Sequence, residues 1–412
     1  MSVLEARSPA VGDELGATTS AGSRLVELAE ELATEIGPRA AHHDRDGTFP
    51  RHSFGAVKRS GYLTAPIPVE LGGLGAASVH DIVVASSRLA RGDASVTLGV
   101  NRHLVFRLTV VRRHAGAAAA GDERRARAFR ETLEDIAGEG TVYAAAVSEP
   151  GQDLGRPATT ARPADGGWIV NGHKIFCTMV SAADVLNTAV TYEDGEGREL
   201  YGYALIPRTA PGVVVHDDWD SLGMRASASH SVSFELVRLP AAALRGGFPV
   251  GDATGYMERN LAPGLFHAAV ALGIAESAHE VAVGRLARRP DTGGELLAAE
   301  SVVELAAARA TLARAAARID EHHAWNPTTR GTADELTALF AGAQSAKAFV
   351  SGAATRVVDR SLTLVGGGGY LSGSPLARAY RDVRAVAFMN PLGAGRAQAF
   401  LGGLAAGRPP VL

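Results

Sequence analysis

The chain has 412 residues, a length that suits roughly two or three domains, and 46% of them are hydrophobic, which is enough for a sizeable core. A formal net charge of −3 gives no electrostatic basis for binding nucleic acid, and no apolar run approaches the ~20 residues that span a bilayer. The single cysteine, Cys177, excludes an intrachain disulfide, and with no signal-like N-terminus we expect a cytoplasmic protein.

The first third of the chain has helical periodicity. Residues 1–20 are polar and rich in Gly, Ala and Thr, which predicts a disordered tail. The first helix follows and is expected to end at Gly37-Pro38. Further helices are expected over roughly 78–91, 93–112 and 121–137. We therefore predict an N-terminal α-helical domain over residues 21–140.

Short β-type runs separated by Gly, Pro, Asp and Asn begin at about residue 141. They predict a β domain over residues 141–248, built as an antiparallel barrel or sandwich. Within it, Trp168 to Lys174 is interpreted as two strand ends around an Asn171-Gly172 hairpin turn, because both residues tolerate positive φ.

Helical periodicity returns at about residue 252 and continues to the end. Three of the segments are long enough to span a helical bundle, which predicts a C-terminal four-helix bundle domain over residues 249–412. The order of helical, β and helical texture favours an α+β fold over a doubly wound sheet. The histidine pairs at 42–43 and 322–323 lack a third ligand, so we predict no metal site.

Five motifs lie in one order along this pattern. They are PIPVELGGLG (66–75), AVSEPGQDLG (146–155), GGWIVNGHKIFCTM (166–179), DSLGMRASASHSVSFELVRLP (220–240) and GGGGYLSGSPLARAYRDVRA (366–385). Each is weak alone, but together they make the chain resemble the acyl-CoA dehydrogenase superfamily over roughly residues 45–400. The resemblance implies the acyl-CoA dehydrogenase fold, a bound FAD or FMN, and a homo-oligomer, tetramer or dimer, with flavin at its subunit contacts.

The same resemblance implies which residues hold the flavin, between the β domain and the C-terminal helices. Ser148 would hydrogen bond the pyrimidine end and N5, Phe176 would stack on the ring, and Thr178 would contact it from the same face of the strand. Arg289 would reach the phosphates, and a glycine run would approach those of a neighbouring subunit. That run is Gly366, Gly367, Gly368 and Gly369. The structural alternatives are a strand-end serine, core packing, a solvated helix end and a flexible turn.

The family's catalytic base is missing from both of its usual positions. Removal of an α-proton by the dehydrogenases needs a Glu or Asp, but the residue eight after Asp382 is Asn390, and the second usual position is Pro263. The superfamily also contains monooxygenases that need no such base, among them dibenzothiophene monooxygenase and the amino-sugar N-oxygenases. They use reduced flavin and O2, and Asn390-Pro391 is similar to the polar residue and proline of the sulfur-oxidising relative.

We therefore favour a monooxygenase acting on a small organic molecule and served by a separate flavin reductase. Asn390, His103 and Ser148 are the predicted catalytic residues, and Ser229, Met389 and Asn390 are predicted to contact substrate. His103 could instead simply pack between helices, and Ser229 could serve a turn. One alternative function is an α,β-dehydrogenase for thioesters of CoA or a carrier protein. Its displaced base would be Glu149, Asp153 or Glu258. A catalytically silent flavin-binding protein is the third reading.

Overall fold

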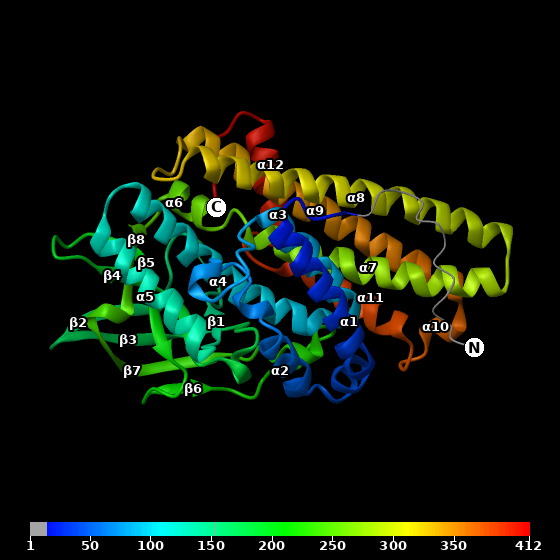
Figure 1. Cartoon of the computed structure of the whole chain (residues 1–412), viewed down its shortest axis with the longest axis horizontal. Helices are drawn as coiled ribbons and strands as arrows, with labels where there is room; N and C mark the ends of the chain where they lie inside the picture. Colours follow the sequence, from blue (N-terminus) through cyan, green and yellow to red (C-terminus); the bar gives the residue numbers. More distant parts are fainter. Residues whose placement is uncertain (1–14, 152) are drawn as a thin grey trace.

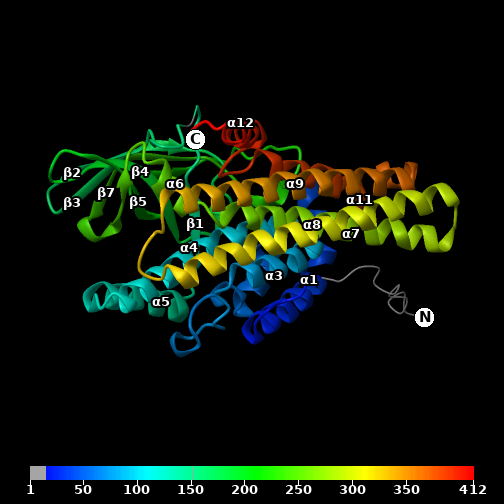
Figure 2. The ribbon, with the colours of Figure 1, turned by 90° about the horizontal axis from the view of Figure 1, so that it is seen from above.

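Three parts follow one another along residues 15–151 and 153–412, which the computed structural model describes. A helical N-terminal part leads into a sheet, and a helical C-terminal part completes the chain, so the predicted α+β class is confirmed (Figure 1). The sheet lies at one end, and the long helices α7, α8 and α9 run side by side away from it (Figures 1 and 2).

From residue 15 on, where the structure describes it, the N-terminal part holds five α-helices and two short 3₁₀ turns. These are α1 Ser20–Asp46, α2 Arg51–Arg59, η1 Tyr62–Thr64, η2 Val69–Leu71, α3 Val79–Gly92, α4 Ala94–Ala119 and α5 Glu123–Glu139. The prediction that Gly37-Pro38 ends the first helix is wrong, because α1 continues to Asp46. The close approach of α1 and α3 depends on Gly92, where a Cβ would lie 2.4 Å from the Ala33 carbonyl oxygen, whereas a Cβ at Gly37 would meet the Gly92 Cα at an ordinary contact distance of 3.5 Å.

The described part of the predicted tail is attached to the N-terminal helices. Leu15 is buried, and the backbone N–H groups and hydroxyls of Thr18 and Thr19 donate to the carboxylate of Asp81 on α3. Thr19 also caps α1. Residues 1–14 lie outside the described residues.

The middle part is an eight-stranded sheet. Its strands are β1 Tyr143–Ala146, β2 Thr160–Ala164, β3 Gly167–Lys174, β4 Val185–Glu193, β5 Glu199–Pro207, β6 Val213–Val215, β7 Val232–Pro240 and β8 Leu244–Pro249. The order is β6-β7-β3-β2-β4-β5-β8, with β1 also on β4. The prediction of an antiparallel sheet is wrong in part, because β1 and β2 both run parallel to β4. The two strands pair with successive stretches of β4, so the chain must leave the sheet between them, in the segment that carries Ser148.

The predicted hairpin at Asn171-Gly172 is also wrong. β3 continues through both residues, and the turn between β2 and β3 lies at Asp165-Gly166, where Gly166 takes a φ of 76°. Asn171 instead accepts a hydrogen bond from Leu236 N at 2.8 Å, beside a register shift between β3 and β7. The extra residue of this bulge lies on β7, where Leu236 takes a φ of 52°, so Asn171 and Gly172 stand within β3 opposite the bulge.

The C-terminal part packs α7, α8, α9 and α11 together. Its helices are α6 Ala253–Arg259, α7 Pro263–Arg288, α8 Thr292–Trp325, α9 Ala333–Val365, α10 Gly367–Tyr370, α11 Pro375–Ala385 and α12 Ala394–Ala405. Four further 3₁₀ turns are η3 Val180–Ala182, η4 Arg225–Ser227, η5 Ala241–Ala243 and η6 Val386–Phe388. Among the described helices none is by itself long and apolar enough to cross a membrane, although α6 and α7, bent by 42°, meet the length and composition test together.

Candidate functional site

A pocket with about 670 Å³ of empty space lies where α4, the sheet and the start of the C-terminal helices meet. Apolar side chains of α4 and β1 form much of its wall. Its polar lining residues are Arg102, Thr109, Asn187, Tyr203, Tyr256, Arg259, Asn260 and Asn390. No Asp or Glu is among the described residues that line it, while two arginines are.

Asn390 and Ser148 meet at the edge of this pocket. The Asn390 Nδ2–H donates to Ser148 Oγ at 2.8 Å, although the two residues are 242 positions apart. Asn390 follows η6 at the end of the C-terminal bundle, and Ser148 follows β1. Two of the three predicted catalytic residues are therefore in direct contact across the junction of the two parts.

Lys347 of α9 and His267 of α7 hydrogen bond to backbone carbonyls of the loop that carries Asn390. The Lys347 ammonium donates to the carbonyls of Met389, of Asn390 at 3.4 Å and of Leu392 at 2.8 Å. His267 Nδ1–H donates to Asn390 O at 2.9 Å. Burial, followed by the positive charge of Arg102, lowers the pKa of Lys347 to about 7. Burial also lowers the pKa of His267 well below its usual value, so its ring is neutral.

The Ser148 turn is anchored by a buried ion pair. Lys174 Nζ donates to Glu149 Oε1 at 2.6 Å, and both side chains are almost fully buried. Thr159 N–H and hydroxyl and Ala158 N–H donate to the same carboxylate. Burial alone would raise the pKa of Glu149, but the charge and hydrogen bond of Lys174 outweigh it, and the pKa lies below its ordinary value. The turn is thus fixed directly next to Ser148.

Phe176 and Thr178 lie in a turn beside Ser148, since Ile175 N–H donates to Ser148 O at 2.9 Å. The prediction that they share one face of a strand is wrong, because β3 ends at Lys174 and Phe176 takes a φ of 56°. The Phe176 ring is 58% exposed, whereas Thr178 is buried and its hydroxyl accepts from Ser229 Oγ at 3.0 Å. The structure therefore gathers four of the predicted residues around one strand end.

These groups fit a flavin by the chemistry of their donors. Ser148 and Thr178 offer hydroxyls to the polar edge of an isoalloxazine, and the open face of Phe176 offers a ring to stack on. The Trp219 indole packs edge-on against Phe176, with 6.1 Å between the two ring centroids. A flavin held there would supply two-electron redox chemistry beside Asn390.

His103 does not line the pocket; its neighbour Arg102 does. His103 is fully buried, its Nδ1 accepts from Tyr143 N at 3.0 Å, and its Nε2 contacts the Arg107 guanidinium. Burial, then the charge of Arg107, lowers its pKa well below the usual value. Arg102 keeps its charge, because burial lowers its pKa only to about 10. The predicted catalytic role of His103 gains no support from the pocket lining, to which its neighbour Arg102 belongs.

The residues predicted to reach the flavin phosphates lie elsewhere in the same chain. Arg289 is exposed at the end of α7. Gly366 joins α9 to α10, and Gly367 to Gly369 begin α10, at the end of the bundle remote from the sheet (Figure 1). Within one chain they do not join Ser148 and Asn390. Met389 is partly buried and contributes its carbonyl to Lys347, not a side chain to the pocket.

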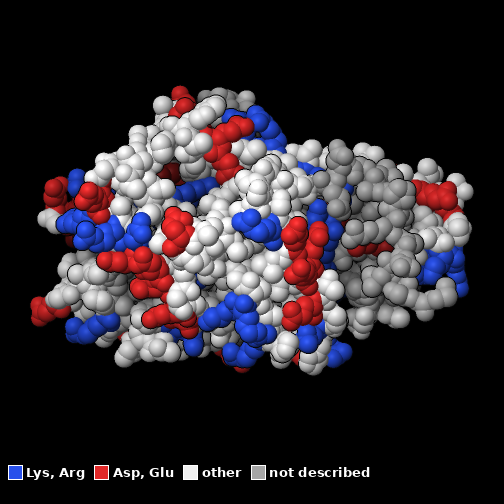
Figure 3. Space-filling model, viewed as in Figure 1, with Lys and Arg blue, Asp and Glu red and all other residues white. Residues whose placement is uncertain are grey.

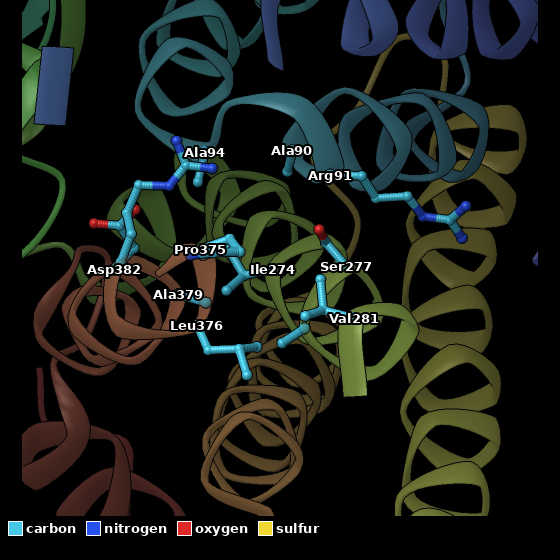
Figure 4. A pocket seen from close by; sticks show the side chains of 12 residues that line it. Ala90, Arg91, Ala94, Ile274, Ser277, Val281, Pro375, Leu376, Ala379 and Asp382 are labelled. Atoms are coloured by element: carbon cyan, nitrogen blue, oxygen red, sulfur yellow. The ribbon is translucent and has the colours of Figure 1, made fainter. Parts of the chain in front are cut away.

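A second, smaller pocket of about 360 Å³ lies between α3, α4, α7 and α11. Figure 4 shows Pro375, Leu376 and Ala379 of α11 gathered opposite Ile274 and Val281 of α7. None of the predicted site residues lines it. It is a seam between packed helices.

The fold defines the class of the protein: a flavin enzyme with helical parts before and after a sheet. The chain belongs to the acyl-CoA dehydrogenase family. Residues 24–119 match the N-terminal domain of acyl-CoA dehydrogenases, residues 144–237 the middle domain and residues 256–394 the C-terminal domain. It is a flavin-dependent oxidoreductase that uses FAD or FMN.

Similar proteins include several nitrososynthases. L-evernosamine nitrososynthase from a Micromonospora species is 34% identical over 401 residues, which cover 94% of this chain and 91% of the relative. Amino sugar nitrososynthase RubN8 from Streptomyces rubradiris is 32% identical over 388 residues, covering 92% and 89%. The structure of KijD3 with FMN and dTDP-3-amino-2,3,6-trideoxy-4-keto-3-methyl-D-glucose has a TM-score of 0.87 at 30% identity and 97% coverage of both chains. FMN-bound TdsC from Paenibacillus sp. A11-2 has a TM-score of 0.80 at 26% identity, covering 94% and 98%.

Proposed function

We propose that this protein is a flavin-dependent monooxygenase that oxidises the nitrogen of an amino sugar. The amine would gain one oxygen atom from O2 to become a hydroxylamine, and the second oxygen atom would leave as water with two protons. The two electrons come from reduced flavin, which a separate reductase regenerates. The three nitrososynthase relatives, each at least 31% identical to this chain, support the choice of nitrogen as the reacting atom.

The observation that carries the proposal is the charge of the pocket. Arg102 and Arg259 line it, and none of its described lining residues is acidic. A nearby positive charge disfavours an ammonium group and so lowers the pKa of an amine bound there. Only the neutral amine has the free electron pair that attacks an electrophilic oxygen. The same described lining residues offer no carboxylate that could serve as a catalytic base.

The three carboxylates considered as displaced bases have other partners. Glu149 is bound to Lys174 and to three donors of the next segment. Glu258 pairs with Arg330 at 3.0 Å. Asp153 accepts from Gly155 N at 2.8 Å. None of them lines the pocket, so they give no support to an α,β-dehydrogenase.

The chain's own groups have definite tasks in this proposal. Asn390 and Ser148 present a linked amide and hydroxyl that can hydrogen bond the reacting groups and relay a proton. Lys347 and His267 keep Asn390 in place. The apolar wall from Val105, Phe106 and Val147 excludes water from the reaction.

The test supplies the purified protein with FMN or FAD, a flavin reductase, NADH and the dTDP-linked amino sugar bound by KijD3. Under ¹⁸O₂ the product should gain one ¹⁸O at nitrogen, seen by mass spectrometry. A reaction lacking the reductase is the control. Unlabelled or absent product, together with anaerobic bleaching of bound flavin by an acyl-CoA, would reject the proposal in favour of dehydrogenation.

A further inference from the structure

The α4 helix lies directly against the turn after β3, where Thr178 is predicted to contact flavin. A Cβ at Gly99 would lie 3.0 Å from the Met179 Cβ, closer than an ordinary contact, so the missing side chain permits this approach. Arg102 follows three residues later, on the same face of the helix. Its charge acts on the thiol of Cys177 in the same turn. The Arg102 guanidinium is therefore close to the residues predicted to contact the flavin ring.

Arg102 is also close to the loop that carries Asn390. The Asn101 Nδ2–H donates to Phe266 O at 3.2 Å, which fixes α4 against α7 at the residues next to Arg102 and His267. His267 in turn donates to Asn390 O at 2.9 Å. Arg102 and Asn390 both line the larger pocket. Arg102 thus lies between the turn after β3 and Asn390, so a flavin contacted by that turn would lie within the field of its charge.

Among the described residues, the positive charge of Arg102 has no counter-charge. No carboxylate in the part of the chain that the structure describes forms an ion pair with it, and no described pocket-lining residue is acidic. Burial raises the pKa of the Cys177 thiol to about 12, so this neighbour is neutral. The outer surface differs, since basic and acidic side chains are interspersed over the face in Figure 3. A cation partly withdrawn from water without a partner is costly, which fits a site that an anionic ligand completes.

We propose that Arg102 stabilises reduced flavin in its anionic form, so that the pocket retains reduced flavin in preference to oxidised flavin. The oxidised ring takes up two electrons from a reductase and one proton from water, and so becomes an anion. A cation close to the ring stabilises this anion but does little for the neutral oxidised ring. The same charge offsets the attraction that an anionic flavin would exert on an ammonium, in agreement with a neutral amine substrate. The inference rests on flavin as the cofactor and not on nitrogen as the reacting atom.

Anaerobic calorimetric titration of the full chain with FMN and FAD, each oxidised and photoreduced, tests the proposal. The wild type should bind the reduced form more tightly. Arg102→Met should lower the ratio of reduced to oxidised affinity roughly 10- to 100-fold, because an opposite charge nearby shifts an ionisation equilibrium by about 1–3 units and partial exposure weakens it. That ratio corresponds to a flavin reduction potential lower by about 30–60 mV. Arg102→Lys keeps the charge and should retain most of the preference. Arg113→Met is the matched control, because Arg113 is exposed about 16 Å further along α4, and its ratio should be unchanged.

A wild type that binds both oxidation states equally would overturn the proposal, as would an unchanged ratio in Arg102→Met. Equal weakening of both forms in Arg102→Met would also overturn it, because that result indicates a packing role and not a charge effect. If Arg102→Met fails to fold, Arg102→Gln and Arg102→Lys give the same comparison, since only the lysine should keep the preference. These measurements need no turnover. A preference for reduced flavin that depends on Arg102, without ¹⁸O incorporation into the amino sugar, would therefore reject N-oxygenation alone.

Discussion

The buried pair of Glu149 and Lys174 gives a sharp test of how the Ser148 turn is held. In Glu149→Gln, the ammonium of Lys174 would stay buried without a counter-charge, because its side chain is fully inaccessible. The new amide would also have to point its NH₂ group at a donor, because the groups that face both carboxylate oxygens of Glu149 are all donors. Breaking one partner of a buried pair in this way costs about 3–5 kcal/mol. We expect the free energy of unfolding to fall by that amount.

Urea unfolding of wild type and variant at one pH measures this difference. Glu199→Gln in the same sheet is the matched control, because Glu199 pairs with Arg156 at 2.5 Å but both side chains are well exposed. Exposed pairs contribute about 0.2–1 kcal/mol. Adding Lys174→Met to Glu149→Gln removes the stranded charge, so the double variant should recover part of the loss. If Glu149→Gln costs no more than Glu199→Gln, the argument that burial gives this pair its weight is refuted.

Three further changes probe the rest of the site and the bundle. Lys347→Met removes the ammonium that holds the Asn390 loop and should lower turnover roughly 10- to 100-fold, whereas Lys58→Met, at an exposed lysine, should leave product formation unchanged; equal rates would argue against a positioning role. Alanine at Asn390, at Ser148 and at both should give a coupling free energy of about 1 kcal/mol in unfolding, and simple additivity would mean that their hydrogen bond contributes nothing. Burial raises the pKa of Asp382 to about 7, above its value in the unfolded chain, so the wild type loses stability as pH rises from about 4 to 7. Asp382→Asn should lack that loss, with a gap of up to ~4 kcal/mol at pH 8 by urea unfolding, and parallel pH profiles would contradict it.

Much of the fold could be predicted because its signals are local. The change from helical to β texture near residue 141, and back near 252, follows from periodicity. The errors arose where one residue pattern serves two structures. Gly37-Pro38 suits a helix end, but α1 continues through it to Asp46. Asn171-Gly172 suits a hairpin, but it lies within β3 opposite a bulge of β7. Only contacts with α3 and β7, distant in sequence, decide between them.

The site was predictable where a motif carried it. Ser148, Phe176 and Thr178 lie together because their motifs end β1 and β3 next to each other. Arg102 was missed because α4 is buried on nearly every side, so the spacing of its apolar residues does not show which side of the helix lines the pocket. Arg259 was missed because it precedes the proline that opens α7 and belongs to no motif. Lys347 was missed because lysines within long helices are mostly exposed to solvent, so the sequence does not indicate a buried one.

The absence of a base and the presence of arginines are two separate properties of the pocket. An asparagine at the predicted base position offers no carboxylate for α-proton abstraction, but it says nothing about what reaction takes place instead. The arginines indicate which substrate form the pocket favours, because their charge disfavours an ammonium and favours a neutral amine. In the proposed function Arg102 acts near the reacting nitrogen, beside Lys347 and His267. An acid among the pocket-lining residues would oppose that effect, and none of the described lining residues is acidic.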